Sequence, residues 1–243
     1  MRMLTFAKRC AKEILRDPLN LMFGLGFPIV LLLLLSAIQA NVPVKLFEIE
    51  SLTPGITVFG LSFMTLFSAT LISKDRESAL LQRLYTTPLT GLDFIIGYML
   101  PILPIALGQT VICYLFAIPL GLNFSINVIY AVIGIIPMAI FNIALGLLCG
   151  SIFGVKQVGG ICGALLTNLS AWLSGVWFDL ELVGGFFERL ANALPFVHAA
   201  EMEKALFHGN FELASSHFVP ILIYSVLVTG IAVFCFLGQK NKQ

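Results

Sequence analysis

Five long runs of the chain contain no Asp, Glu, Lys or Arg. They cover residues 18–44, 51–73, 94–155, 157–178 and 213–239. About 20 apolar residues cross the hydrocarbon core of a bilayer, so each run is long enough for a membrane helix. The run 94–155 has room for two helices around its polar middle, Asn123 to Asn127. The pattern therefore predicts six transmembrane helices.

The predicted fold is an all-α integral membrane protein, with residues 1–243 forming a single transmembrane domain. The runs lack the two-residue alternation that marks the strands of a membrane barrel. Composition agrees, because 58% of the residues are hydrophobic and 11% are charged, whereas soluble domains carry about 25% charged residues. The six spans are expected at about 19–40, 54–73, 94–119, 128–153, 158–178 and 218–237.

The basic residues are distributed unequally between the two sides that six spans define. Lys45, Arg189 and Lys204 fall on the side opposite the termini. The remaining ones fall on the side of both termini: Arg2, Lys8, Arg9, Lys12, Arg16, Lys74, Arg76, Arg83, Lys156, Lys240 and Lys242. Lys and Arg are enriched in cytoplasmic loops, so we expect a multi-pass protein of the plasma (inner) membrane with both termini cytoplasmic. The first span is too long for a cleaved signal peptide and no A-x-A site follows it, so we expect it to be retained.

Residues 1–18 have the pattern of an amphipathic helix. One helical face carries Met3, Phe6, Ala7, Cys10 and Ile14, and the basic residues lie elsewhere. This favours an interfacial helix on the inner leaflet. An ordinary basic flank of the first span fits the pattern equally well.

The segment 179–217 predicts two short outer helices that rest in the outer leaflet or re-enter it. Apolar residues recur at helical spacing up to Leu194, Pro195 ends the first helix, and residues 197–207 form the second. His198, His208, Glu201 and Glu203 lie in this segment. Isolated His and Glu side chains on an exterior helix seldom bind zinc, so no metal site is expected.

Within the spans, small and hydroxyl-bearing residues indicate helix contacts. Gly146, Gly150 and Gly154 recur every fourth residue, as do Gly159 and Gly163, which predicts close backbone approach. Thr57, Thr65, Ser68 and other hydroxyls of the second span either line a polar path or bond neighbouring helices.

Several function classes find no support in the residues. Every charged residue lies outside the predicted spans, so an ion-coupled pump lacks its usual groups. No His precedes Glu and no G-x-S-x-G occurs, which excludes those hydrolase motifs. No Lys precedes Ser or Thr, so the chain has no Walker A phosphate loop. A net charge of +1 carries no signal for nucleic-acid binding.

The cytoplasmic loop 74–93 reads KDRESALLQRLYTTPLTGLD and predicts a short helix between spans two and three. Leu80, Leu81, Leu84 and Tyr85 form an apolar face, with Asp75, Arg76, Glu77, Gln82 and Arg83 elsewhere and Thr87-Pro88 at the end. A merely solvated connector would leave four large apolar residues exposed, so a partner is expected to hold this helix.

The loop resembles a segment of the ABC-2 permease family, the membrane subunits of type-2 ABC exporters. That segment reads roughly E-R-E-x-G-T-x-E-x-L-x-x-T-P, and Asp75-Arg76-Glu77, Leu84 and Thr87-Pro88 match it. Ser174 to Phe178, and Leu194 to Ala199 with Glu201, are also similar to the family.

The resemblance implies a permease that pairs with a second permease chain and with two ABC ATP-binding subunits. ATP and Mg²⁺ would bind to those subunits, and this chain would carry no cofactor and no catalytic site. The coupling residues that it implies are Asp75, Arg76, Glu77, Gln82, Arg83, Leu84, Thr87 and Pro88. The expected cargo is a hydrophobic or amphipathic solute, such as a drug, peptide antibiotic, lipid or glycan. The alternative is a non-transporting membrane scaffold or an intramembrane enzyme without a recognised motif.

Overall fold

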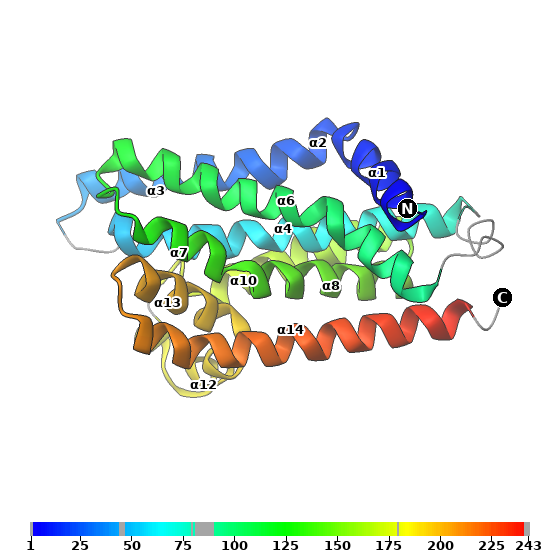
Figure 1. The fold of residues 1–243 in the computed structure, drawn as a ribbon. Coiled ribbons are helices and arrows are strands. Elements are labelled where there is room, and N and C mark those ends of the chain that lie inside the picture. The colour runs from blue at the N-terminus through cyan, green and yellow to red at the C-terminus, as the bar shows by residue number, and fades with distance from the viewer. Residues whose placement is uncertain (1, 44–46, 79, 81–89, 179, 241–243) are drawn as a thin grey trace.

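The computed structural model describes residues 2–43, 47–78, 80, 90–178 and 180–240. Throughout these ranges the regular elements are helices, and no strand occurs among them (Figure 1). The all-α fold class is therefore confirmed. Both ends of the chain lie at the same end of an elongated helical bundle.

In the described ranges, five helical runs are long and apolar enough to cross a membrane. They are Pro18–Asn41, Ile49–Glu77, Gly91–Leu120, Asn127–Ile152 and Phe211–Gly238. These runs coincide with the predicted spans one, two, three, four and six. Their helices are α2 (Pro18–Leu21), the π-helix η1 (Met22–Gly26), α3 (Phe27–Asn41), α4 (Ile49–Glu77), α6 (Gly91–Ala117), η2 (Ile118–Leu120), α7 (Asn127–Gly134), α8 (Ile136–Ile152) and α14 (Phe211–Lys240).

The predicted fifth span, 158–178, falls on three consecutive helical segments. They are α9 (Val155–Val158), the π-helix η3 (Gly159–Leu166) and α10 (Thr167–Leu173). The run begins before the predicted span and ends earlier, and it contains the polar residues Lys156, Gln157 and Asn168. It is not among the five candidate spans. The count of six spans therefore stays a prediction.

Helix α4 forms the centre of the bundle and is buried along most of its length. It packs closely on α8 because Gly146 and Gly150 face it. A Cβ at Gly146 would collide with the Thr65 carbonyl group, and one at Gly150 with the backbone of Ala69. The predicted close approach is confirmed at these glycines. A Cβ at Gly159 would meet open space, so the second glycine repeat does not mark a similar contact.

The hydroxyl groups of α4 bond to neighbouring helices. Thr65 Oγ1 donates to the backbone carbonyl oxygen of Asn142 at 2.9 Å, and Ser68 Oγ lies 3.0 Å from the carbonyl oxygen of Ile143. Both residues are buried. Of the two interpretations of this hydroxyl-rich span, helix bonding is the one that these contacts support.

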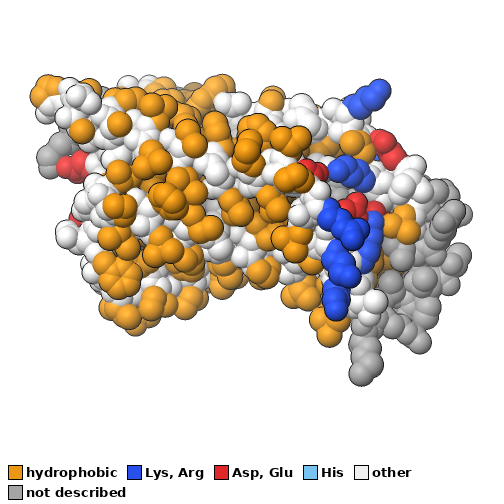
Figure 2. Space-filling model, turned by 90° about the horizontal axis from the view of Figure 1, so that it is seen from above, with side chains coloured by type: hydrophobic (Ala, Val, Ile, Leu, Met, Phe, Trp, Pro, Cys, Tyr) orange, Lys and Arg blue, Asp and Glu red, His pale blue; other side chains and the backbone are white. Residues whose placement is uncertain are grey.

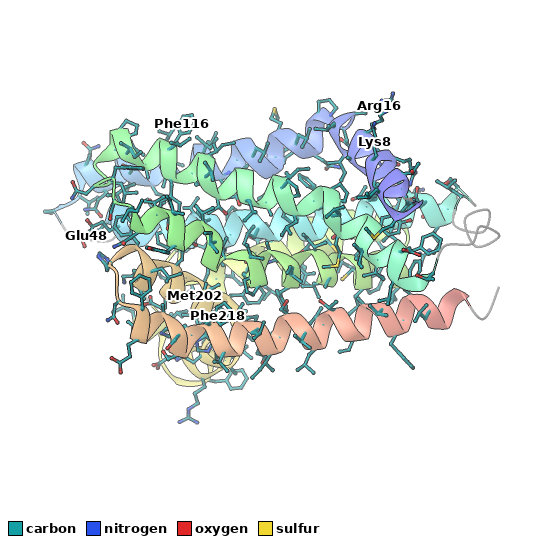
Figure 3. All side chains as sticks on the ribbon, in the orientation of Figure 1. Lys8, Arg16, Glu48, Phe116, Met202 and Phe218 are labelled. Carbon is teal, nitrogen blue, oxygen red and sulfur yellow. The ribbon has the colours of Figure 1, made fainter. Side chains whose placement is uncertain are left out.

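The outer surface of the bundle is strongly apolar. Large hydrophobic side chains are exposed along α3, α6 and α14, among them Val30, Leu34, Val111, Leu115, Leu222, Val226 and Phe234. Figure 2 shows such side chains spread over one face of the molecule, with Lys and Arg gathered at the end where α1 (Arg2–Leu15) lies. Lys8 and Arg16 lie at this end and Glu48 at the opposite one (Figure 3). This is the surface expected of a helical bundle embedded in lipid.

Between residues 180 and 207, the part up to residue 193 lies on the exterior of the bundle, and the part from Pro195 lies inside it. Helices α11 (Leu180–Val183) and α12 (Gly185–Ala193) expose Leu182 and Phe186. Helix α13 (Pro195–Phe207) instead packs against α14, α7 and α4, and most of its residues are buried. Of the two placements predicted for this pair, resting in the outer leaflet does not describe α13, and re-entry stays a prediction. Small Ala residues on α13 allow it to fit between longer helices.

Candidate coupling site

Asp75, Arg76 and Glu77 lie in the last turn of α4, where the Ser78 amide donates to the Lys74 carbonyl at 3.0 Å. The helix of the second span thus continues to Glu77, into the segment 74–93 that was predicted as the cytoplasmic loop. We call these three residues the α4 terminal cluster. Gln82, Arg83, Leu84, Thr87 and Pro88 lie outside the described residues, so the coupling helix itself stays a prediction.

Asp75 is 1% exposed and is held by two other helices. Its two carboxylate oxygens each accept a hydrogen bond from the Arg9 guanidinium of α1, both at 2.5 Å. The Tyr98 hydroxyl of α6 donates to the same carboxylate at 2.8 Å. A forked Arg–carboxylate pair fixes orientation as well as charge, so Asp75 joins α1, α4 and α6.

The pairing also explains the position of α1. Its apolar face is buried, and the Phe6 ring packs edge-on against Phe94 at 5.5 Å and Tyr98 at 4.9 Å between ring centroids. Cys10 on this face is so well covered that burial raises the pKa of its thiol to about 12. The face that was expected to rest on the inner leaflet is thus covered by α6.

Arg9 keeps its charge although its side chain is partly covered. Burial acts to lower the pKa of Arg9, but the hydrogen bond and the charge of Asp75 outweigh it and hold the pKa above its ordinary value. Glu13, one turn further along α1, lies 2.5 Å from the same guanidinium. One cation therefore balances two carboxylates at this end of the bundle.

Arg76 and Glu77 bond to the connection between α8 and α9. The Arg76 guanidinium donates to the carbonyl oxygens of Ser151 and Phe153, the latter at 2.7 Å. Glu77 Oε1 accepts a hydrogen bond from the Val155 amide at 2.8 Å. The last carbonyl groups of a helix favour a positive charge nearby, and the free amides of a first helical turn favour a negative charge. Arg76 and Glu77 are placed in agreement with this rule. These two residues therefore hold the turn that leads out of α8.

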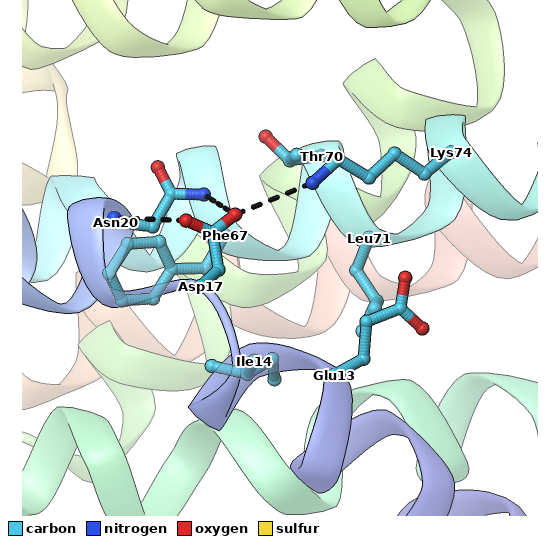
Figure 4. A pocket seen from close by; sticks show the side chains of 8 residues that line it. All are labelled: Glu13, Ile14, Asp17, Asn20, Phe67, Thr70, Leu71 and Lys74. Atoms are coloured by element: carbon cyan, nitrogen blue, oxygen red, sulfur yellow. Dashed lines mark hydrogen bonds and ion pairs between the residues drawn. The ribbon is translucent and has the colours of Figure 1, made fainter.

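Lys74 links the same turn of α4 to the start of α2 (Figure 4). Its amine lies 3.4 Å from Asp17, which also caps α2 by accepting from the Asn20 amide at 3.3 Å. Both Lys74 and Asp17 are partly exposed, so the pair is solvent-screened. The close-up shows Phe67 and Leu71 of α4 facing Ile14 of α1 beneath this pair.

Comparison with known proteins identifies the family of this chain. The ABC-2 type transporter family matches residues 1–208. The chain belongs to this family. The ABC-2 chain is also 24% identical over 208 residues to the "Probable multidrug ABC transporter permease YbhR" of Escherichia coli strain K12, and equally so to the protein of that name from E. coli O157:H7. The match covers 82% of this chain and 54% of the relative, so the chain spans about half the length of the curated relatives it matches.

In the ABC-2 fold of this chain, the α4 terminal cluster reaches four other helices. Asp75 contacts α1 and α6, while Arg76 and Glu77 contact the end of α8 and the start of α9. All three side chains thus have partners within the chain, although the sequence suggested that they face a partner protein.

Two members of this site were not predicted from the sequence. Arg9 and Tyr98 were not assigned a role, although Arg9 and Glu13 stand one helical turn apart, which is a recognisable pairing signal. Tyr98 gave no signal, because a Tyr within an apolar span usually needs no charged partner.

The four side chains of segment 179–217 that were weighed as metal ligands lie in separate contacts. His198 Nδ1 lies 2.9 Å from His217 Nδ1, His208 lies 3.9 Å from Glu50, and Glu201 lies 3.9 Å from Lys204. Glu203 points into the bundle and contacts Thr57 of α4. Glu203 lies outside the predicted spans, and it is nevertheless buried inside the bundle.

Proposed function

We propose that this chain is the membrane permease subunit of an ATP-driven ABC exporter. The observation that carries the proposal is the ABC-2 family match over residues 1–208, because that family forms the membrane subunits of transporters. The cargo we propose is a hydrophobic or amphipathic solute, and this class is supported by the name of the E. coli relative, a probable multidrug permease. The exposed apolar surface suits a protein that handles such solutes from lipid.

The proposed assembly contains two permease chains and two ABC ATP-binding subunits, which bind ATP and Mg²⁺. The segment 155–173, which falls on the predicted fifth span, also crosses the membrane and brings the number of crossings to six. An even number of crossings puts both termini on one side, which is the cytoplasmic side of the plasma membrane. This placement is supported by the Lys and Arg residues gathered at the end that carries α1 (Figure 2). α13 then lies at the outer side as a re-entrant helix.

In the proposed mechanism, the ATP-binding subunits press on the segment that follows α4. The α4 terminal cluster passes this movement to α1, α6, α8 and α9 through the contacts described above. Asp75 acts from within the chain, and the residues nearer to Arg83 make the contact with the ATPase. ATP binding thereby shifts the bundle between inward-facing and outward-facing states.

The test is co-expression of the chain with candidate ATP-binding subunits, followed by purification and measurement of solute-stimulated ATP hydrolysis. We expect a stable complex and a loss of coupled hydrolysis in the charge-reversal variant Arg83→Glu. Lys156→Glu reverses an exposed charge on the same side and is the matched control, which should behave as wild type. A chain that never associates with an ATP-binding subunit would overturn the proposal and favour a scaffold or an intramembrane enzyme.

A further inference from the structure

A second polar cluster lies inside the bundle where α13 packs against α4. It consists of Glu203 of α13, Thr57 of α4 and Tyr114 of α6, and we call it the Glu203 cluster. Glu203 and Thr57 are fully buried, and Tyr114 is 2% exposed. Residue Met202, next to Glu203, marks this region in Figure 3.

The contacts of Thr57 fix where protons lie in this cluster. Thr57 Oγ1 lies 2.6 Å from the carbonyl oxygen of Pro54 and 2.5 Å from Glu203 Oε2. A hydroxyl group has one proton, so it must share that proton between the two oxygens or donate to only one of them. If Glu203 is a carboxylate, the two short contacts therefore have one proton between them. If Glu203 is a carboxylic acid, it donates to Thr57 Oγ1, and Thr57 donates to Pro54.

The surroundings of Glu203 also disfavour a negative charge. Glu203 Oε1 and the Tyr114 hydroxyl lie near each other, and neither atom has a close hydrogen-bond partner among the described residues. Lys204, the next residue of α13, pairs with Glu201 instead. A buried carboxylate with no cation beside it, and with the Thr57 hydroxyl as its one close donor, is costly, and such a group becomes neutral by binding a proton.

The titratable groups that face Glu203 are few. Cys113 and Tyr114 of α6 lie beside it, and α4 contributes Thr57. On the remaining elements packed against α13, His217 of α14 faces His198, and no charged group of α7, α10 or α12 pairs with Glu203 in the described ranges. Burial raises the pKa of Glu203 to about 8, and the contacts with Thr57 and Tyr114 oppose this only in part.

We propose that Glu203 is a proton-binding site, occupied while α13 is packed against α4 and emptied when α13 moves away from it. On opening, the O–H bond at Oε2 breaks, the proton passes to a water molecule that enters the gap, and the carboxylate remains. On closing, the carboxylate takes up one proton from water. The ligand is thus a single proton, and its uptake is tied to the packing of α13. This proposal does not depend on the cargo or on the ATP-binding partner.

The test is infrared difference spectroscopy of the full chain in lipid nanodiscs at neutral pH. A protonated carboxylic acid has a carbonyl stretching band that carboxylates lack, and this band moves when water is replaced by D₂O. We expect one such band in the wild type, its complete loss in Glu203→Gln, and its retention in Glu201→Gln. Glu201 stands two residues away on the same helix and is the matched control. Absence of the band in wild type, or its persistence in Glu203→Gln, would overturn the proposal.

A second measurement covers the case in which Glu203→Gln does not fold. In the wild type, the same band should disappear as the pH is raised through about 8, because burial raises the pKa of Glu203 to about that value. Thr57→Val removes the acceptor of the acid proton, so the band should remain and shift in frequency. If the band does not disappear at high pH and does not shift in Thr57→Val, it does not belong to Glu203. That result would also overturn the proposal.

Discussion

Asp75 and Glu203 are both buried carboxyl groups at helix contacts, yet their partners differ. Asp75 receives two hydrogen bonds from Arg9 and one from Tyr98, whereas Glu203 contacts Thr57 alone within hydrogen-bond distance. The two residues lie toward opposite ends of the bundle, since α1 and α13 are at its two ends (Figure 1). A buried acid keeps its charge where a cation is buried with it, and binds a proton where none is.

The difference suggests two kinds of helix contact in one membrane domain. We call the contact of Asp75 with Arg9 and Tyr98 the Asp75 joint, and the contact of Glu203 with Thr57 the Glu203 joint. The Asp75 joint holds α1, α4 and α6 together by an ion pair that requires both partners. The Glu203 joint holds α13 against α4 only while the acid is neutral. The first suits a permanent connection at the proposed ATPase side, and the second suits a contact that opens and closes.

The largest expected effect comes from removing the cation of the Asp75 joint. Arg9→Met leaves Asp75 buried without its counter-ion, which should lower the free energy of unfolding by about 3 kcal/mol. The measurement is the free energy of unfolding of the wild type and of the variant, both in nanodiscs. The double variant Arg9→Met with Asp75→Asn should recover most of the loss, since it removes both charges.

The control for this experiment is the exposed pair on the same turn. Lys74→Gln breaks the 3.4 Å contact with Asp17, and a screened pair of this kind contributes about 0.5 kcal/mol or less. An Arg9→Met loss as small as that of Lys74→Gln would show that Asp75 does not depend on Arg9.

The next effect is a pH dependence that belongs to the Glu203 joint. The pKa of Glu203 rises from its ordinary 4.5 to about 8 in the folded chain because of burial, so the folded state holds a proton that the unfolded state has released. The stability that this proton contributes is fully present below about pH 4.5 and is lost as the pH rises toward 8. We expect a loss of about 1 kcal/mol for each pH unit in this window, so a step of one pH unit has a smaller effect than Arg9→Met.

Glu203→Gln isolates this contribution. The amide holds the same shape without titrating, so the difference in unfolding free energy between wild type and variant should change with pH across that window. Glu201→Gln, on the same helix, should follow the wild type. If the difference between wild type and Glu203→Gln is constant with pH, Glu203 does not carry the linked proton.

The smallest effects are expected when either of the two hydroxyl groups that contact these acids is removed. Tyr98→Phe removes a hydrogen bond to a charged carboxylate and should cost about 2 kcal/mol, whereas Thr57→Val removes a bond between neutral groups and should cost about 1 kcal/mol. Unfolding measurements at neutral pH test the order. Equal costs, or a larger cost for Thr57→Val, would contradict the assignment of charge to Asp75 and neutrality to Glu203.

The sequence predicted the long helices well because lipid tolerates few charges. The charge-free runs mark five helices, and the structure extends some of them beyond the predicted ends, as at Ile49 and Phe211. Glycine spacing predicted the contact of α8 with α4 at Gly146 and Gly150, since only a missing side chain permits it. Both signals are local, so they can be read without knowing which residues meet in space.

The side-chain partners could not be predicted in the same way. Arg9 and Asp75 are 66 positions apart, and Thr57 and Glu203 are 146 apart. A charged residue near a helix end is normally solvated, and this default misplaced both Asp75 and Glu203. Helical spacing shows which residues share a face, but it does not show which helix covers that face, so the sequence left open whether α13 rests in the outer leaflet or re-enters it.

The most direct measurement of the account is carbon-13 NMR of the side-chain carboxyl groups of the full chain in nanodiscs at neutral pH. Resonances of Glu203 and Asp75 are assigned by their loss in Glu203→Gln and Asp75→Asn. The account predicts that Glu203 resonates at the position of a protonated acid and Asp75 at that of a carboxylate. If both resonances lie at the carboxylate position, the proposed difference between the two joints is contradicted.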